Sequence, residues 1–267
     1  MDLNDTDYET SLAIFHQRYS TNTLPNWELA QPFRFLAHNG EINTLQGNQN
    51  WIRARENQLR SSLWGDDVSR LTPIIGKGGS DSASLDNVLE ALVLSGRGLL
   101  QSMAMLVPEA WENMPNMPSK LREFYEYHAC ITEPWDGPAS LVYSDGRYVS
   151  ALLDRNGLRP ARYLITEDNI IVMGSEVGMV DIDEAKIIEK GRLGPGQMIA
   201  VDTLEGKLLK NQDIKNGLSY LNNYGEWLNK HMIYFDKYLE SANMDLSTIE
   251  PSSEVLRAFG YTTEEMK

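Results

Sequence analysis

The sequence predicts an α+β protein in which a mostly antiparallel sheet is covered by helices. Two short apolar segments near the start each end in polar residues, a region of helical periodicity follows, and a series of hairpin patterns comes after it. Strands and helices that are segregated along a chain are typical of α+β folds. Because they do not alternate strictly, a doubly wound parallel sheet is not expected.

Residues 12–18 and 33–38 are the first two predicted strands. Residues 12–18 alternate loosely between apolar and polar side chains, and residues 33–38 are mostly apolar. Both patterns indicate a strand with a buried face. A loop with the sequence LPNWELAQP separates them.

Four helices are expected next. Residues 82–95 have an apolar stripe at helical spacing, with Ser80 or Asp81 as a suitable N-cap and Gly96 as a residue that can end the helix. The other predicted helices are 43–62, 99–106 and 119–129.

Three hairpins are predicted in the following part of the chain. The Asp145-Gly146 pair indicates a tight type I′ turn in the first of them. The paired ranges are 139–144 with 147–154, 161–166 with 170–175, and 197–203 with 207–210, with a turn-rich segment at 191–196. The helical period then returns from about residue 211, and we expect a main domain at 1–210 and a helical extension at 211–267.

Composition excludes several classes of function. With 24 basic and 38 acidic residues the formal charge is −14, which argues against broad contact with nucleic acid or an anionic membrane. No stretch has the ~20 apolar residues of a membrane helix, and the acidic start is unlike a signal peptide, so we expect a cytoplasmic protein.

The only cysteine is Cys130, so this chain alone can form neither a disulfide framework nor a multi-cysteine metal or iron–sulfur site. Its apolar neighbours predict a buried structural thiol. The histidines lack the spacing of metal ligands, and no metal site is expected.

Arg18 lies at the end of the first predicted strand. A guanidinium in such a position can bind a carboxylate through two parallel hydrogen bonds. The hydroxyl- and amide-rich residues 19–23 that follow it are typical of a structured polar pocket. The alternative is a solvated or salt-bridged surface arginine.

Asn39 and Gly40 end the second apolar segment. A side-chain amide beside a backbone N–H offers two donors to an oxygen that becomes negative during a reaction. The alternative is a hairpin turn, for which Asn-Gly is the commonest dipeptide. Residues 41–44 do not resume an alternating strand, which weakens the hairpin interpretation.

Asp81 follows a glycine-rich loop with the sequence GKGGSD. The loop is not a Walker phosphate loop, because Lys77 is followed by Gly78 rather than by Ser or Thr. A helix N-cap would explain these residues, and Asp81 could also bind an ammonium group; the two roles can coexist. Together with Arg18, an ammonium-binding carboxylate indicates a pocket for an amino acid.

Five motifs, in this order and spacing, closely resemble the glutamine amidotransferase domain of the glutamate synthase large-subunit family. The resemblance runs from about residue 11 to residue 210. The motifs are FHQRYSTNT, FLAHNGEINT-x-x-GN, GGSDSASLDN, CITEPWDGPASL and LDRNGLRPARY.

The resemblance implies an N-terminal-nucleophile fold, in which two antiparallel sheets pack between helical layers in an αββα sandwich. In that family an N-terminal cysteine attacks the side-chain amide of glutamine, ammonia leaves, and water releases glutamate. By the matching motifs, Arg18 would bind the α-carboxylate of glutamine and Asp81 its α-ammonium. Asn39 and Gly40 would form the oxyanion hole, and Thr21 would be a further contact with the substrate.

The start of the chain departs from the family pattern. It begins Met1-Asp2, so we expect the N-terminal cysteine and the N-terminal part of the sandwich to be missing. Cys130 lies mid-chain without a free α-amino group, and we expect this chain alone to be inactive. The resemblance implies FMN and an iron–sulfur cluster in synthase domains outside this sequence, with no cofactor bound here.

The expected partners are glutamine or glutamate and the remainder of a synthase or a separate chain. Two alternatives stay open at this point. One is a nucleophile-free module that senses glutamine or glutamate, and the other is an interaction subunit whose site is completed by a partner chain.

Overall fold

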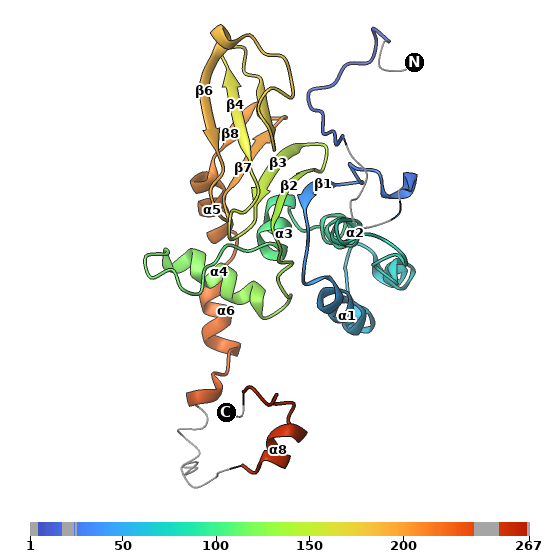
Figure 1. Ribbon diagram of the computed structural model, residues 1–267, viewed down its shortest axis with the longest axis vertical. Coiled ribbons are helices and arrows are strands. Elements are labelled where there is room, and N and C mark those ends of the chain that lie inside the picture. Colours follow the sequence, from blue (N-terminus) through green and yellow to red (C-terminus); the bar gives the residue numbers. More distant parts are fainter. Residues whose placement is uncertain (1–4, 18–23, 25, 238–250, 266–267) are drawn as a thin grey trace. The chain divides into compact units, whose positions relative to one another are not determined.

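The first compact unit, Met1–Gly225, contains two antiparallel sheets in the computed structural model (Figure 1). The structure describes residues 5–17, 24, 26–237 and 251–265. The larger sheet has five strands in the order β1-β2-β3-β7-β8, and the smaller has three in the order β5-β4-β6. The strands are β1 (Leu36–Gly40), β2 (Ala139–Ser144), β3 (Tyr148–Leu153), β4 (Arg162–Thr166), β5 (Ile171–Gly174), β6 (Ile187–Arg192), β7 (Met198–Asp202) and β8 (Lys207–Leu209).

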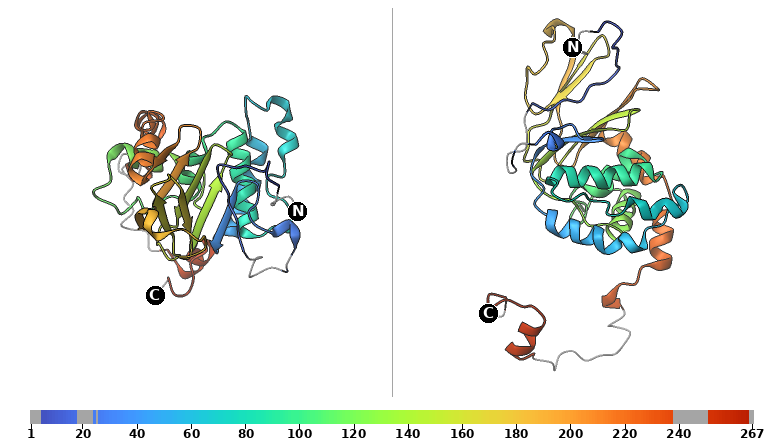
Figure 2. Two further views of the ribbon diagram at one scale, coloured as in Figure 1. Left: turned by 90° about the horizontal axis from the view of Figure 1, so that it is seen from above. Right: turned by 90° about the vertical axis from the view of Figure 1, so that its right-hand side faces the viewer.

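The helices of this unit follow the predicted periodicities. Those of the described residues are α1 (Leu45–Arg55), α2 (Asp81–Leu94), α3 (Leu99–Leu106), α4 (Ser119–Ala129), α5 (Asn211–Ser219) and α6 (Tyr224–His231), the last continuing into the second unit. The side view in Figure 2 shows α1 (blue) and α2 (green) running side by side, as their contacts require. Short 3₁₀ helices occupy Trp27–Leu29, Glu56–Gln58, Gly65–Leu71 and Glu184–Lys186.

Helix α2 begins where its sequence predicts. Ser80 is the N-cap, and its hydroxyl accepts a hydrogen bond from the backbone N–H of Ala83 at 3.1 Å. Gly96, just after the helix, has a φ of +95°, which a residue with a side chain rarely adopts. Leu85 and Leu89 are fully buried on the inner face.

The main core lies between the helices and one face of the five-stranded sheet. The sheet contributes residues such as Leu36, Tyr143 and Met198, and α3 and α4 contribute residues such as Met103 and Phe124, all of them fully buried. Its other members come mainly from α2, α5 and strands β2, β3 and β7.

A smaller core joins the two sheets. It holds Leu153 of β3 and Ile199 of β7 together with Tyr163 of β4 and Met173 of β5. Leu153 and Ile199 alternate with side chains that face the helices, so β3 and β7 are covered on both faces. The predicted α+β fold with antiparallel sheets is therefore confirmed, with helices on one sheet and a second sheet on its opposite face.

Several predicted elements differ from the structure. Residues 12–17 are not a strand, and the second predicted strand begins at Leu36 rather than at residue 33. Helix α1 ends at Arg55, short of the predicted residue 62. Strand β6 occupies Ile187–Arg192, partly within a segment predicted to be turns.

The turn between β2 and β3 is also different from the prediction. A type I′ turn needs positive φ at both central residues, but only Gly146 has one, at +91°, and Asp145 does not. The carboxylate of Asp145 instead accepts hydrogen bonds from the backbone N–H groups of Arg147 and Tyr148, at 3.0 and 2.8 Å. An Asx turn therefore replaces the predicted backbone geometry.

The second compact unit is Glu226–Lys267. Within its described residues, α8 (Ser253–Ala258) is capped by Ser252, whose hydroxyl accepts a hydrogen bond from the backbone N–H of Val255 at 3.3 Å. The main-domain boundary at residue 210 stays a prediction. Helix α5, which lies beyond it, belongs to the first unit and buries Ile214 in the main core.

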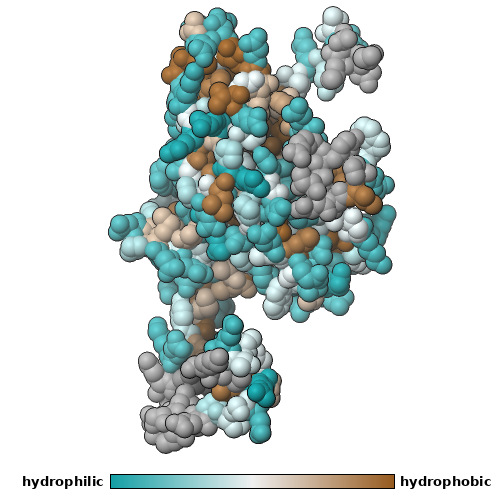
Figure 3. All heavy atoms as spheres, in the orientation of Figure 1, coloured by the Kyte–Doolittle hydropathy of each residue, from teal (hydrophilic) through white to brown (hydrophobic). Residues whose placement is uncertain are grey.

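The outer surface carries both polar and apolar areas. On the face shown in Figure 3, apolar side chains gather around the three-stranded sheet, where Ile188 of β6 is 68% exposed. Across the described ranges, no helix is long and apolar enough to cross a membrane.

Candidate active site

Strand β1 lies at an edge of the five-stranded sheet, and its register decides where its amide groups point. The N–H of Ser144 donates to the carbonyl of Phe35 at 2.8 Å, and that of Glu41 donates to the carbonyl of Pro138 at 3.1 Å. In an antiparallel pair, hydrogen-bonded residues alternate with residues whose backbone groups face away. The N–H groups of Leu36, His38 and Gly40 therefore point to the free edge.

Two of these three edge amides are satisfied by side chains. The N–H of Leu36 donates to Asp86 Oδ1 at 2.9 Å, and that of His38 donates to Gln31 Oε1 at 2.7 Å. The N–H of Gly40 has no acceptor among the described residues. It is therefore a backbone donor at the free edge of the sheet, next to the side-chain amide of Asn39.

Gly40 can only be glycine here. Its φ is +137°, and a Cβ atom would lie 1.8 Å from the carbonyl oxygen of Pro138. The preceding residue, Asn39, is exposed and pairs with Ser140 in the β1–β2 ladder. The alternative interpretation of Asn39-Gly40 as a hairpin turn is therefore wrong, because both residues belong to a strand.

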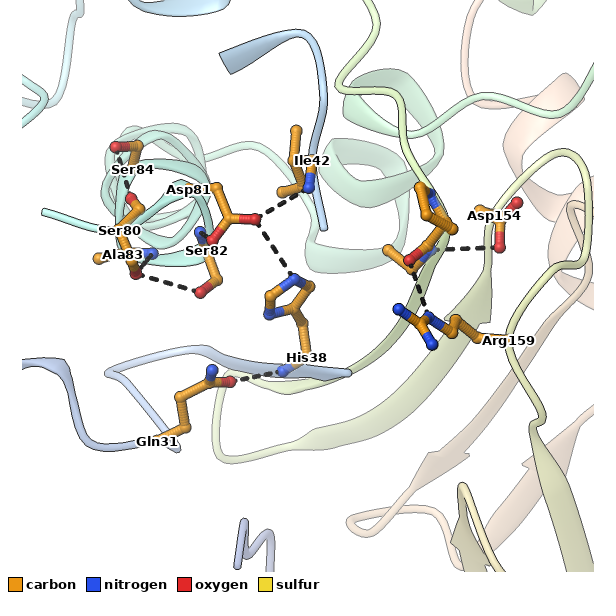
Figure 4. Close-up of polar contacts among 12 residues, drawn as sticks. Gln31, His38, Ile42, Ser80, Asp81, Ser82, Ala83, Ser84, Asp154 and Arg159 are labelled. Atoms are coloured by element: carbon orange, nitrogen blue, oxygen red, sulfur yellow. Dashed lines mark hydrogen bonds and ion pairs between the residues drawn. The ribbon is translucent and has the colours of Figure 1, made fainter. Parts of the chain in front are cut away.

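Asp81 begins helix α2 beside the end of β1. Its Oδ2 accepts a hydrogen bond from the backbone N–H of Ile42 at 2.8 Å, and its Oδ1 accepts one from Ser82 at 2.7 Å. Nε2 of His38 lies 3.6 Å from Oδ2, an ion-pair distance slightly too long for a hydrogen bond (Figure 4). Asp81 thus joins the start of α2 to the segment that follows Gly40.

The carboxylate of Asp81 stays charged. Burial raises the pKa of Asp81, but the neighbouring His38 and the backbone N–H groups of Ile42 and Ser82 outweigh it and hold the pKa below its ordinary value. The side chain is 22% exposed, so a ligand can reach it. Both predicted roles are compatible with this geometry, although the capping hydroxyl is that of Ser80.

The backbone opposite Gly40 is fixed by the loop after β3. Buried Asp154 accepts a hydrogen bond from the N–H of Ala139 at 3.2 Å, and it also accepts from the loop amides of Asn156 and Leu158. Nε of Arg159 donates to the carbonyl of Pro138 at 3.3 Å. Figure 4 shows Asp154 and Arg159 converging on this backbone from one loop.

The residue types alone assign no role to His38, Asp86 or Asp154. Each of them contacts a residue that is distant in the sequence and that only the fold brings close. The neighbouring sequence therefore does not reveal the contact. The one indication of a role for Asp154 was its position in the motif LDRNGLRPARY. Arg159 of the same motif also contacts the backbone at residues 138–139.

Arg18 and Thr21 lie outside the described residues, so their predicted roles stay predictions. The described residues thus bring together three of the five predicted site residues, namely Asn39, Gly40 and Asp81. Among the described residues, no group of three or more His, Cys, Asp or Glu side chains could hold a metal ion.

Cys130 is the C-cap of α4 and is exposed, so the prediction of a buried thiol is wrong. Its Sγ donates to the carbonyl of Glu126 at 3.2 Å. Partial burial and the charge of Glu126 raise the pKa of the thiol above its ordinary value. A raised pKa disfavours the thiolate, which is the nucleophilic form.

At the end of β1, the described residues thus place a backbone N–H without an acceptor next to an exposed asparagine, and the charged carboxylate of Asp81 accepts a hydrogen bond from Ile42 two residues further on. The profile of a protein family, "Glutamine amidotransferases class-II", matches residues 1–227. The chain belongs to the class II glutamine amidotransferases. Its family membership agrees with the resemblance carried by the five motifs.

Relatives with longer sequences match the whole chain. It is 47% identical to ferredoxin-dependent glutamate synthase 1 of Arabidopsis thaliana, 47% to the NADPH glutamate synthase large chain of Azospirillum brasilense, and 42% to that of Bacillus subtilis. Each match covers 100% of this chain, but 17%, 18% and 17% of the respective relatives. The chain therefore spans less than a fifth of their length.

Solved structures give more distant matches. A glutamine phosphoribosylpyrophosphate amidotransferase from B. subtilis is 18% identical, with a TM-score of 0.40 over 73% of this chain and 34% of that one. A class II glutamine aminotransferase domain protein from Silicibacter pomeroyi is 19% identical, with a TM-score of 0.37 over 69% of this chain and 72% of that one.

Proposed function

We propose that this chain is the glutamine-binding part of the amidotransferase domain of a glutamate synthase. In the proposed reaction, a nucleophile attacks the side-chain amide carbon of glutamine and its oxygen becomes negative. The N–H of Gly40 and the side-chain amide of Asn39 bind that oxygen. Asp81 binds the α-ammonium of glutamine, Arg18 binds the α-carboxylate, and Thr21 makes a further contact with the substrate.

The observation that carries the proposal is the edge of β1. Its first two outward N–H groups are taken up by Asp86 and Gln31, whereas that of Gly40 has no acceptor in the described part of the chain. A preorganised donor of this kind stabilises charge that develops in a transition state, because it needs no reorganisation when the charge appears. The charged carboxylate of Asp81, which accepts a hydrogen bond from Ile42 two residues after Gly40, suits the cationic end of an amino acid.

We further propose that the attacking thiol comes from outside this sequence. Cys130 is the only cysteine, and its nitrogen is a peptide N–H that donates to Tyr127 at 3.2 Å, so it offers no free α-amino group as a base. Its raised pKa also opposes nucleophilic attack. The chain alone is therefore inactive, and a further segment or a partner chain completes the site.

In the complete synthase, ammonia released from glutamine would pass to a second centre that forms glutamate from 2-oxoglutarate. We propose that FMN and an iron–sulfur cluster belong to that centre. Cysteine thiolates hold such clusters, and the single cysteine of this chain does not suffice, so other segments would supply the ligands. A cytoplasmic location remains part of the proposal.

Glutamine binding tests the assignment of the residues. Calorimetry on the full chain should give an affinity that falls about tenfold or more in Asp81→Asn and in Arg18→Ala, since each variant loses a charge-assisted contact. Asp168→Asn is the matched control, because Asp168, in the turn between β4 and β5, forms an exposed ion pair with Lys186. Unchanged affinity in Asp81→Asn, or no binding by the wild type, would contradict the proposal.

Glutamate release tests the origin of the nucleophile. The purified chain should release no glutamate from glutamine, with or without Cys130→Ala. Release that persists in Cys130→Ala would show another nucleophile within the chain, and release that this change abolishes would assign the role to Cys130. Either result would overturn the proposal of an external thiol. Co-purification with a polypeptide that begins with cysteine would support it.

A further inference from the structure

His38 occupies a special place next to the candidate oxyanion hole. It directly precedes Asn39-Gly40 on β1, and its backbone N–H is held by Gln31. Because side chains alternate along a strand, its imidazole lies on the same face as Leu36, toward the helices, whereas Asn39 faces the opposite side. Figure 4 shows the ring directed from β1 toward Asp81.

The imidazole is buried without a conventional hydrogen bond. His38 is 7% exposed, and neither ring nitrogen has a hydrogen-bond partner among the described residues. Its nearest charged neighbour is Asp81, whose Oδ2 lies 3.6 Å from Nε2. Buried polar atoms are normally paired, so a ring left in this state calls for an explanation.

The surroundings of Asp81 supply that explanation. Its carboxylate meets the N–H of Ile42 and the imidazole of His38, which stand on either side of Asn39-Gly40 in the chain. The N–H of Ser82 holds the remaining oxygen from the helix side. The orientation of the Asp81 carboxylate is therefore fixed by residues that flank Asn39-Gly40, the proposed oxyanion donors at the end of β1.

We propose that His38 is a positioning residue that directs the carboxylate of Asp81 at the α-ammonium of glutamine. This inference rests on the proposed function, in which Asp81 binds that ammonium. His38 does not touch the substrate. Its Nε2 restrains Oδ2 from the strand side, and a small approach of the two atoms forms a hydrogen bond when the ligand is bound.

Two substitutions separate positioning from packing. His38→Leu fills a similar space without a donor, whereas His38→Gln retains an N–H near the position of Nε2. The two ligands are glutamine and glutaramate, which is glutamine without its α-amino group. Calorimetry is carried out on the full chain, with urea unfolding measured for each variant.

We expect His38→Leu to weaken glutamine binding about tenfold and glutaramate binding less than twofold. His38→Gln should bind glutamine within about threefold of the wild type. Equal losses for both ligands in His38→Leu, or a loss in His38→Gln as large as that in His38→Leu, would assign His38 to packing alone and overturn the inference.

Asp81→Asn distinguishes failure of this inference from failure of the proposed function. If Asp81→Asn weakens glutamine binding but His38→Leu does not, only the positioning role is wrong. If Asp81→Asn has no effect, or if the wild type does not bind glutamine, both proposals fail.

A second measurement does not use His38→Leu, so it tests the inference even if that variant does not fold. The ring nitrogen resonances of His38 in the ¹⁵N-labelled wild type are assigned by their absence in His38→Gln. Glutamine should shift the Nε2 resonance, and glutaramate should not. No shift on saturation with glutamine, or the same shift with both ligands, would contradict the inference.

Discussion

The carbonyl oxygen of Pro138 excludes any side chain at Gly40, where a Cβ atom would lie only 1.8 Å away. The same oxygen accepts hydrogen bonds from the N–H of Glu41 and from Arg159. It cannot withdraw without breaking them. The tight approach of these two backbones thus holds the Gly40 N–H toward the free edge of the sheet.

Gly40→Ala should therefore destabilise the protein and distort the site. We expect a loss of about 2 kcal/mol or more in the free energy of unfolding, because the alanine would be strained in φ and would also clash with Pro138. Urea unfolding and glutamine calorimetry measure the two effects.

Gly47→Ala is the matched control for that substitution. Gly47 lies in helix α1 with nothing within 4 Å of the added atom, so alanine should raise the free energy of unfolding by about 0.5–1 kcal/mol. Similar effects of the two substitutions would show that the contact with Pro138 is not rigid.

Asp81→Asn should change the response of the protein to acid. The pKa of Asp81 is lowered in the folded state, so its ionised carboxylate stabilises the fold above the unfolded pKa of about 3.9. That contribution is lost as pH falls through the folded pKa. The difference in unfolding free energy between wild type and variant should be constant near neutrality and shrink below about pH 4.

Unfolding by urea at a series of pH values measures this difference. Asp168→Asn is again the control, since its exposed carboxylate pairs with Lys186 at the surface. A difference that grows toward low pH would mean that the folded protein does not favour the charged form of Asp81.

The sequence predicted the helices well because their signals are local. The stripe of α2 and its Ser80 cap lie within one short segment, and the ranges of α3 and α4 agree with the structure. The predicted strand at residues 12–18, of which the structure describes 12–17, shows the limit of such signals. Leu12 and Ile14 are half-buried in a shallow pocket with Phe33 and Phe35, so their alternation reflects partial burial without strand pairing.

Strand β6 was not predicted, because its sequence carries little of the apolar signal that a buried strand has. Its sequence IIEKGR is largely polar, yet it pairs with β4 and alternates between half-buried and exposed side chains. Pairing at a sheet edge depends on the neighbouring strand more than on local hydrophobicity.

The roles of Asn39, Gly40 and Asp81 stay predictions. Their choice as candidates was possible from the donors and the charge of these residue types alone. The contact between Asp86 and the N–H of Leu36 could not be predicted, because it joins residues that are 50 positions apart. The order of the motifs cannot show which backbone amides such a side chain will occupy.

His128 should make the protein sensitive to mild acid. It is buried on α4, where its Nδ1 lies 2.7 Å from the carbonyl oxygen of Phe124 and its Nε2 lies 3.4 Å from the side-chain nitrogen of Gln101. Burial lowers the pKa of His128 from 6.5 to about 4. The fold therefore favours the neutral ring, with a hydrogen on Nδ1 that donates to Phe124.

Since the folded pKa lies below the unfolded one, this contribution to stability is complete above pH 6.5 and is lost as pH falls toward 4. The wild type should lose up to about 3 kcal/mol more than His128→Gln over that interval, as measured by urea unfolding. His231→Gln, which removes an exposed imidazole from α6, should keep the wild-type slope. Parallel slopes in wild type and His128→Gln would contradict the expectation.

Lys215 should be the most costly lysine to replace. It is 3% exposed, and its Nζ donates to Glu109 Oε1 at 2.8 Å and also to the hydroxyl of Tyr125. That hydroxyl donates in turn to Glu109 at 2.9 Å. Burial lowers the pKa of Lys215, and Glu109 opposes that effect, so the two side chains depend on each other.

Lys215→Met should lower the free energy of unfolding by about 3 kcal/mol, because it leaves Glu109 without its cation. The double variant Lys215→Met with Glu109→Gln should recover part of the loss, since it removes the uncompensated charge as well. Lys210→Met is the control, because Lys210 pairs with Glu189 on the surface and should change stability little. If Lys215→Met were as mild as Lys210→Met, the three-residue contact that joins α4 and α5 would contribute no more than a surface ion pair.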